Sequence, residues 1–291
     1  MFPVLVKEII VSTLRQRFQN DMVLRGLAQC TQDAYLDAVA KIAKYYHRSP
    51  DQISPEEIKQ YLLHLIKDKH LSTSTTNQAG CALRFLFRVT LNQPEIGIEI
   101  PLRKPPERLP ELLSRQEVES ILAACTNLRH RTILTTIYAT GLRVSELCQL
   151  KVSDVDSKRM MLRISHGKGG KDRYTLLSPK LLQTLRIYWQ AFRPDDWLFP
   201  KLDGSRPISD SQIQRLFYAA KRRAKVTKQG GIHSLRHAFA THLLDSGVDL
   251  HSISRLMGHD HLSTTARYLH LQQQVVKTDS PLDLLSNLSK L

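Results

Sequence analysis

Four short segments in the second half of the chain gather side chains that suit chemistry on a phosphate group. The first reads TGLRVSEL over residues 140–147, where Gly141 allows a turn and a helix can begin with Arg143 in its first turn. The second reads HGKGGKD over 166–172 and carries Lys168 between glycines. Arginine donates paired hydrogen bonds to phosphate oxygens, and glycine lets the backbone come close to a phosphate. Taken alone, each segment has a simpler interpretation, an exposed arginine at a helix start or a solvated charged turn.

The other two segments add histidine and tyrosine. Residues 232–237 read IHSLRH, in which His233 and Arg236 stand three apart, so that a helix places both side chains on one face. Further on, a Gly-His pair ends in His259, and Tyr268 follows nine residues later. A single histidine or tyrosine is more often packed in a core than catalytic, so neither segment is specific by itself.

Together, in this order and spacing, the four segments resemble the tyrosine recombinase (phage integrase) family. The signature of that family is an Arg in TGLRxSEL, a Lys on a β-hairpin, HxLR, and GH followed by a Tyr. The similarity spans roughly residues 106–272, extends more weakly over about 15–105, and is greatest to Xer-like recombinases and to integrases of mobile elements. This chain has a residue at every position of the signature: Arg143, Lys168, His233, Arg236, His259 and Tyr268.

The resemblance implies a site-specific DNA recombinase that works through a 3′-phosphotyrosyl intermediate and a Holliday junction. In that mechanism Tyr268 attacks the phosphodiester, His233 acts as the base, and Lys168 protonates the 5′-oxygen that leaves. Lys168 is chosen over Lys171 because it is the lysine of the GKG segment. The covalent link keeps the bond energy, so that rejoining needs no ATP.

The charge that builds up on the phosphate would be stabilised by Arg143, Arg236 and His259, according to the same resemblance. Donors of this kind contribute about 3–4 kcal/mol each when they are preorganised. Because these groups belong to the protein, we expect neither a metal ion nor another cofactor. A zinc site built from the several histidines of residues 233–270 is the rival interpretation, and the lack of an HExxH motif and of nearby cysteines speaks against it. Glu146 is expected to support the Arg143 segment.

The composition agrees with a nucleic-acid partner. The 291 residues include 42 Lys and Arg against 27 Asp and Glu, a formal net charge of +15. A chain this basic usually meets a polyanion, with nucleic acid the first candidate and an anionic membrane surface the second. No stretch reaches the roughly 18 apolar residues of a membrane span. The four cysteines stand far apart in the sequence, which favours buried free thiols in a reducing compartment over disulfides. We therefore expect a cytoplasmic bacterial protein that is associated with the nucleoid when it is bound to DNA.

The expected partner is double-stranded DNA at recombination sites, held between two domains as in a clamp. A tail segment at 279–288 predicts a short helix with an apolar face, which in the family docks on a neighbouring protomer, although it could also pack on its own domain. The resemblance thus implies a homo-tetramer on DNA, or a hetero-tetramer with a paralogue. Five basic residues are candidate DNA contacts, and a solvated helix end is an equal alternative for the last three: Lys171, Arg173, Arg222, Arg223 and Lys225.

Hydrophobic periodicity predicts a mainly α fold with a small antiparallel β-sheet, arranged in two domains. The family resemblance implies that residues 1–105 form a helical core-type DNA-binding domain. In it, Thr31 can cap one helix, Ser54 opens a capping box for a second, and a third runs through 79–87.

A stretch with five prolines over residues 92–112 predicts an extended linker, because proline restricts both itself and the residue before it. The resemblance implies that residues 106–291 form the catalytic domain with its tail helix. This domain starts with a capping box at Ser114, and its sheet contains a β-hairpin formed by 160–164 and 173–177.

Two other functions use parts of the same pattern. A type IB topoisomerase-like enzyme would relax DNA by the same chemistry without strand exchange, and a catalytically inactive protein would only bind DNA. The helical first domain and the tail favour a recombinase over the first alternative, and the complete set of six residues favours it over the second. DNA integration or excision by a mobile element and the resolution of chromosome or plasmid dimers both stay open as the biological role.

Overall fold

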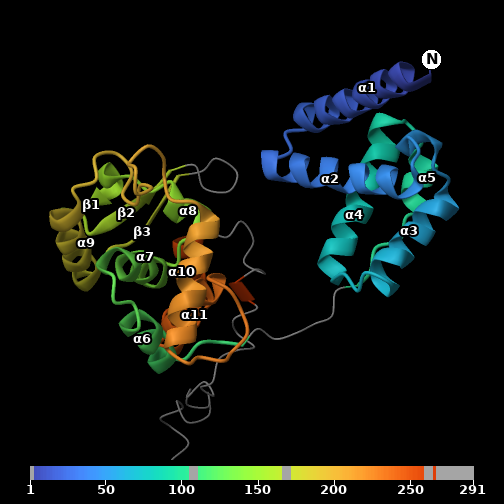
Figure 1. Cartoon of the computed structure of the whole chain (residues 1–291). Coiled ribbons are helices and arrows are strands. Elements are labelled where there is room, and N and C mark those ends of the chain that lie inside the picture. The colour runs from blue at the N-terminus through green and yellow to red at the C-terminus, as the bar shows by residue number, and fades with distance from the viewer. Residues whose placement is uncertain (1–2, 105–110, 166–171, 259–264, 267–291) are drawn as a thin grey trace, which may run out of the picture. The chain divides into compact units, whose positions relative to one another are not determined.

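The structure, a computed structural model, describes residues 3–104, 111–165, 172–258 and 265–266, without the side chains of 3–12 and 97–99. The chain divides into two compact units, Met1–Arg108 and Leu109–Leu291 (Figure 1). Each unit has a hydrophobic core of its own. Both units are built mainly from helices, and the second also contains a three-stranded antiparallel sheet. The predicted fold class is therefore confirmed.

The first unit is a helical bundle in which α2 packs along α4. A short 3-10 turn, Pro50–Gln52, precedes α3, and a π-helical turn, Leu86–Thr90, continues α4. Its helices are α1 (Pro3–Leu24), α2 (Gln29–Tyr46), α3 (Pro55–Lys67), α4 (Thr73–Phe85) and α5 (Pro94–Glu99). Its largest fully buried side chains include Phe18, Met22, Ile42, Ile58, Leu83 and Phe87.

Local side-chain chemistry decides where two of these helices begin. Ser54 accepts a hydrogen bond from the backbone of Glu57, whose carboxylate accepts one from the backbone of Ser54 at 2.9 Å, so that the predicted capping box is present. Ser72 caps α4 in the same way through its hydroxyl. The prediction for Thr31 is wrong, because α2 already begins at Gln29 and Thr31 lies inside its first turn.

The proline-rich stretch differs from the predicted linker. Pro94 occupies the first turn of α5, where a helix needs no N–H from it. The segment that follows is tied to α4: Arg84 Nε donates to the carbonyl of Ile100 at 2.8 Å, and the Asn77 side chain and the Arg103 backbone exchange two hydrogen bonds of 2.8 Å each. Residues 94–104 therefore belong to the first unit, and an extended linker from about 92 is wrong for this part. Residues 105–110 lie outside the described residues.

In the second unit, helices pack against the buried face of a small sheet (Figure 1). A buried cluster formed by α6, α7, α9, α10 and β2 makes up most of its core. A 3-10 turn, Val152–Asp154, leads into the sheet. Its elements are α6 (Arg115–Ala123), α7 (Leu128–Thr140), α8 (Val144–Cys148), β1 (Val155–Asp156), β2 (Met161–Ile164), β3 (Arg173–Leu176), α9 (Pro179–Phe192), α10 (Asp210–Arg223), α11 (His233–Asp245) and α12 (Leu250–Met257).

The sheet has the order β1-β2-β3, and both pairs are antiparallel. The register pairs Met161 with Leu176 and Ile164 with Arg173, so the two predicted strands are confirmed, whereas the two-residue strand β1 was not predicted. Thr175 donates its hydroxyl proton to the carbonyl of Thr140 at 2.9 Å. This bond fixes β3 against the end of α7, where the TGLRVSEL segment begins.

None of the helices in the described parts of the chain is long and apolar enough to cross a membrane. Of the four free thiols, Cys125 and Cys148 are buried, as predicted, but Cys30 is exposed and Cys81 is half-buried.

Candidate active site

A tight turn after α7 places Arg143 at the start of α8. Gly141 has a φ of 64°, and a Cβ at this position would lie 2.3 Å from the ring of Phe239. Only glycine fits both the left-handed backbone and the close ring. The backbone N–H of Arg143 then donates to Glu146 Oε2 at 2.8 Å, which closes the first turn of α8. The TGLR segment is thus a helix end, a turn and a helix start in four residues.

Glu146 contacts three arginines, one at the start of its own helix and two from distant elements, β3 and α11. Arg143 Nη1 donates to its Oε1 at 2.8 Å. Arg173 donates from both terminal nitrogens to the two carboxylate oxygens, each at 2.7 Å. Arg236 Nη1 lies 3.9 Å from Oε2. We call these four residues the Glu146 cluster. Three guanidinium groups against one carboxylate leave it with a formal charge of +2.

Glu146 is buried at the centre of the cluster, and its ionisation follows from its contacts. The side chain of Glu146 is 5% exposed. Burial alone would raise the pKa of this carboxyl group, but the hydrogen bonds and charge of Arg173, followed by those of Arg143, outweigh burial and lower the pKa to about 2. Glu146 is therefore a carboxylate at neutral pH, and the arginines retain a fixed partner.

The same arginines bind the last carbonyl groups of α12, which no helical N–H reaches. Arg143 Nη2 donates to the carbonyl of Gly258 at 2.8 Å, and Arg236 Nη2 donates to that of Met257 at 2.7 Å. Arg236 also donates to the carbonyl of Gly141. Gly258 ends the helix with a φ of 63°, and His259 is the next residue along the chain. Two arginines from separate helices therefore meet at the point where the Gly-His segment begins.

The structure brings together two of the six predicted catalytic residues and describes a third. Arg143 and Arg236 share the Glu146 cluster, and the side chain of Arg143 is the more exposed, at 24% against 6%. His233 is exposed in the first turn of α11, three residues before the buried Arg236. The other three residues, Lys168, His259 and Tyr268, lie outside the described residues.

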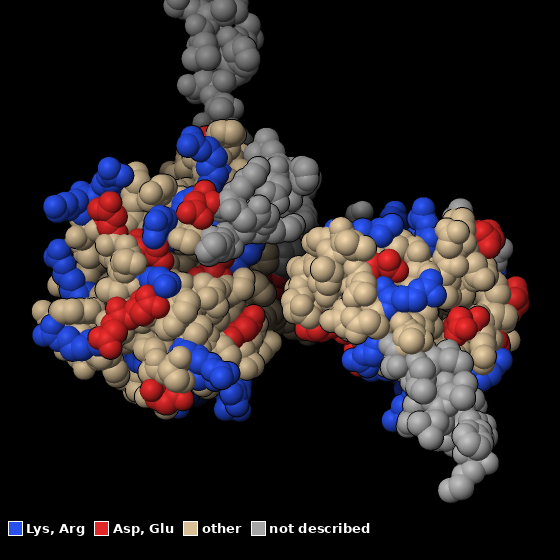
Figure 2. All heavy atoms as spheres, turned by 90° about the horizontal axis from the view of Figure 1, so that it is seen from above, with Lys and Arg blue, Asp and Glu red and all other residues tan. Residues whose placement is uncertain are grey.

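The predicted DNA contacts divide into two groups. Arg222 and Arg223 in the last turn of α10, and Lys225 just beyond it, are exposed and accessible to a phosphate. On the face of the second unit that Figure 2 shows, basic side chains are interspersed with acidic ones. Lys171 lies outside the described residues. Arg173 differs from the expectation, because its side chain is 12% exposed and its guanidinium is directed inward to Glu146.

The structural role of Arg173 escaped the sequence interpretation, because strand alternation shows which side chains share a face but not which face is buried. In the structure Thr175, two residues after Arg173, is buried. Arg173 therefore lies on the inner face of the sheet, where an arginine needs a carboxylate partner.

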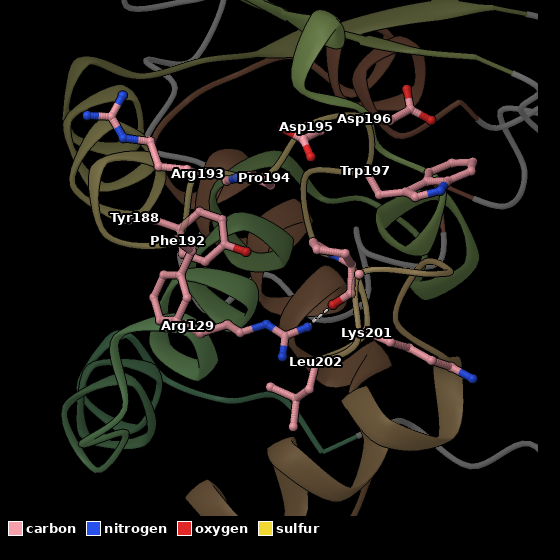
Figure 3. Close-up of a pocket in the computed structure, with 12 residues that line it drawn as sticks. Arg129, Tyr188, Phe192, Arg193, Pro194, Asp195, Asp196, Trp197, Lys201 and Leu202 are labelled. Carbon is pink, nitrogen blue, oxygen red and sulfur yellow. Dashed lines mark hydrogen bonds between the residues drawn. The ribbon is translucent and has the colours of Figure 1, made fainter.

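A separate cavity of about 340 Å³ lies beside the end of α9. Figure 3 shows Tyr188 and Phe192 on one side of it, and the buried Arg129, which donates to the backbone carbonyl of Pro200. None of its lining residues belongs to the Glu146 cluster. The cavity therefore contributes nothing to the arrangement of Arg143 and Arg236.

Comparison with known proteins finds a matching family model for each of the two units. The model of the phage integrase family matches residues 111–275, and that of the phage integrase N-terminal SAM-like domain matches residues 14–96. The Sinorhizobium fredii protein y4qK, named as a proposed integrase/recombinase, is 43% identical over 96% of this chain and 91% of its own length. The tyrosine recombinase XerC of Lactobacillus delbrueckii subsp. bulgaricus is 33% identical over 83% of this chain and 88% of its own length. A lambda integrase tetramer bound to a Holliday junction has a similar fold, with a TM-score of 0.74, 18% identity, and coverage of 92% of this chain and 80% of that one.

Proposed function

This chain belongs to the phage integrase family, and we propose that Tyr268 is the nucleophile with which it cuts and rejoins DNA. The protein is a site-specific DNA recombinase, an enzyme that transfers DNA strands through a tyrosine-linked intermediate. Attack by the phenol oxygen of Tyr268 on the phosphorus forms the 3′-phosphotyrosyl bond and breaks the bond to the 5′-oxygen. A 5′-hydroxyl from the other duplex then reverses these steps and releases the tyrosine.

One observation carries the proposed site, the convergence of Arg143 and Arg236 on the buried Glu146. Both guanidinium groups are fixed before a substrate arrives, and the cluster keeps a formal charge of +2 after Glu146 is counted. Fixed positive charge in a water-poor place stabilises the extra negative charge of a phosphoryl transition state. His259 follows the helix end that both arginines bind, and we assign it a third hydrogen bond to the same phosphate.

Two residues are assigned the proton transfers. His233 is exposed one helical turn before Arg236, where its imidazole can take the proton of the attacking tyrosine. Lys168 precedes β3 by five residues, and β3 begins with Arg173 of the Glu146 cluster. A lysine this close in sequence to a strand that begins in the cluster is suited to protonate the departing 5′-oxygen.

The DNA contacts and the assembly complete the proposal. Arg222, Arg223 and Lys225 bind backbone phosphates, with Lys171 from the hairpin turn. Four protomers, of this protein alone or with a paralogue, act on two duplexes in the cytoplasm. Both biological roles, movement of a mobile element and dimer resolution, are compatible with relatives named as an integrase/recombinase and as XerC. Chemical crosslinking of the protein on paired DNA sites is expected to give a tetramer, and a product no larger than a dimer would contradict this assembly.

The central test is covalent trapping on nicked DNA that carries candidate sites. The wild-type chain is expected to form a protein–DNA adduct, whereas Tyr268→Phe should bind the same DNA without forming one. Tyr218→Phe is the matched control, because Tyr218 is a half-exposed tyrosine of α10 in the same unit and should leave the adduct at wild-type level. An adduct that persists in Tyr268→Phe would show that another residue is the nucleophile.

A further inference from the structure

We propose that Arg173 is a positioning residue for recombination, which balances the charge of Glu146 so that Arg143 and Arg236 stay directed to the phosphate. The inference rests on the proposed roles of these last two arginines. It assigns to the first residue of β3 a task in catalysis, without any contact between Arg173 and the DNA.

The geometry makes Arg173 the main partner of Glu146. It binds both carboxylate oxygens at 2.7 Å, the paired arrangement that is strongest between arginine and a carboxylate. Arg143 has one side-chain hydrogen bond to Glu146, and Arg236 lies at 3.9 Å. Arg173 occupies both oxygens of the carboxylate and balances most of its negative charge. Glu146 therefore holds Arg143 and Arg236 in place while their positive charge stays available to a phosphate.

Removal of Arg173 would reverse this balance. A buried carboxylate without its main partner is costly, so it draws in the nearest cations. Those cations are Arg143 and Arg236, whose guanidinium groups would turn toward Glu146 and away from the substrate. The positive charge of the cluster would also fall from +2 to +1.

Arg173 also supports the helix end that leads to His259. Its Nε donates to the carbonyl of Leu256 at 3.3 Å. A Cβ at Gly258 would lie 2.7 Å from its Cδ and Nε atoms, so the arginine side chain packs directly against this glycine. Arg173 therefore contacts both Glu146, in the Arg143 segment, and the end of α12. It does so from the second strand of the hairpin whose turn contains Lys168.

The alternative role for Arg173 is a DNA contact, and its placement argues against this role. The side chain is 12% exposed, and Nε, Nη1 and Nη2 all donate to protein acceptors. A phosphate contact by Arg173 would have to replace one of these three hydrogen bonds, and it would appear as a change in the salt dependence of binding.

The test compares DNA affinity and the single-turnover rate of adduct formation at saturating DNA, with the full chain and nicked DNA. Arg173→Met is expected to bind with wild-type affinity and salt dependence but to cleave about 100-fold more slowly, the scale of a 1 Å misplacement. Arg173→Lys keeps the charge but loses the paired bonds, so a loss of about tenfold is expected. The double variant Arg173→Met/Glu146→Gln should be at least about tenfold faster than Arg173→Met, because no unbalanced carboxylate then remains to attract the other arginines.

Arg163→Met is the matched control. Arg163 lies on the neighbouring strand β2, and its Nε donates to the buried Asp154 at 3.0 Å, so this variant also loses an arginine–carboxylate pair of the same sheet. Its cleavage rate is expected to stay at the wild-type level. If Arg173→Met does not fold, as judged by its far-ultraviolet circular dichroism, Arg173→Lys carries the comparison.

Three results would overturn the inference. Arg173 is a DNA contact if Arg173→Met weakens binding and lowers the salt dependence while cleavage at saturating DNA is unchanged. Charge balancing is wrong if the double variant is no faster than Arg173→Met, or if Arg173→Lys cleaves at the wild-type rate. An adduct that persists in Tyr268→Phe refutes the proposed nucleophile but not the role of Arg173, which is judged from its own rates. A wild-type chain that forms no adduct refutes both proposals.

Discussion

Gly141→Ala is expected to lower the urea concentration at which the second unit unfolds. Two independent losses of stability, one from the backbone and one from packing, add up at this position. The backbone of Gly141 is left-handed, with a φ of 64°, which costs an L-residue about 1–2 kcal/mol. The new methyl group would also lie 2.3 Å from Cδ1 and 2.6 Å from Cε1 of Phe239. The ring cannot swing into solvent, because it is buried with Leu244, Ile253 and Met257. Such overpacking typically costs about 1–3 kcal/mol, so the total is about 2–5 kcal/mol.

Gly247→Ala separates the two contributions. Gly247 also has a positive φ, 86°, but a Cβ there meets nothing within 4 Å, so only the backbone cost of about 1–2 kcal/mol applies. Both tryptophans, Trp189 and Trp197, lie in the second unit, so tryptophan fluorescence follows the unfolding of this unit in urea. A lower midpoint at an unchanged slope measures the loss of stability. Equal midpoints for Gly141→Ala and Gly247→Ala would refute the close contact with Phe239.

Three further predictions follow from single contacts. The folded pKa of Glu146, about 2, lies below the ordinary 4.5, so its stabilisation is present above pH 4.5 and is lost as the pH falls toward 2. Over this range the wild type should lose about 3 kcal/mol that Glu146→Gln does not, as measured by urea midpoints at several pH values; parallel curves would contradict the prediction. Ser114→Ala removes the hydroxyl that accepts from the backbone of Glu117 and should cost about 1 kcal/mol in thermal unfolding, so an unchanged melting temperature would argue against the capping box. Arg222→Gln and Arg223→Gln should each lower the slope of log K against log salt by about 0.9 without changing stability, and an unchanged slope would remove that residue from the DNA contacts.

Elements whose cause is local could be predicted from the sequence. The capping boxes at Ser54 and Ser114 depend on residues three apart, and the structure contains both. The strands around the glycine-rich turn depend on a short apolar period, and they pair as expected. Glycine readily adopts the left-handed conformation that ends many helices, and Gly258 ends α12 in this way.

Elements that depend on distant partners could not be predicted in this way. The prolines near Pro94 indicate an extended chain, yet Asn77 and Arg84 of α4 hold the segment after α5 against the first unit. Two signature positions, Arg143 and Arg236, were matched by resemblance, but their convergence on one carboxylate is a property of tertiary packing. The inward direction of Arg173 required knowledge of which face of its strand is buried.

A carboxylate that serves three arginines also constrains how the sequence can change over evolution. If Arg173 alone is replaced, Glu146 stays charged but loses its main hydrogen-bond partner. If Glu146 alone is replaced, three arginines are left close together without a carboxylate. Neither single step is neutral, whereas a paired replacement can be. Substitutions at 146 and 173 should therefore covary among relatives, and recombinases without an arginine at the start of this strand should have found another cation, or a neutral residue in place of the glutamate.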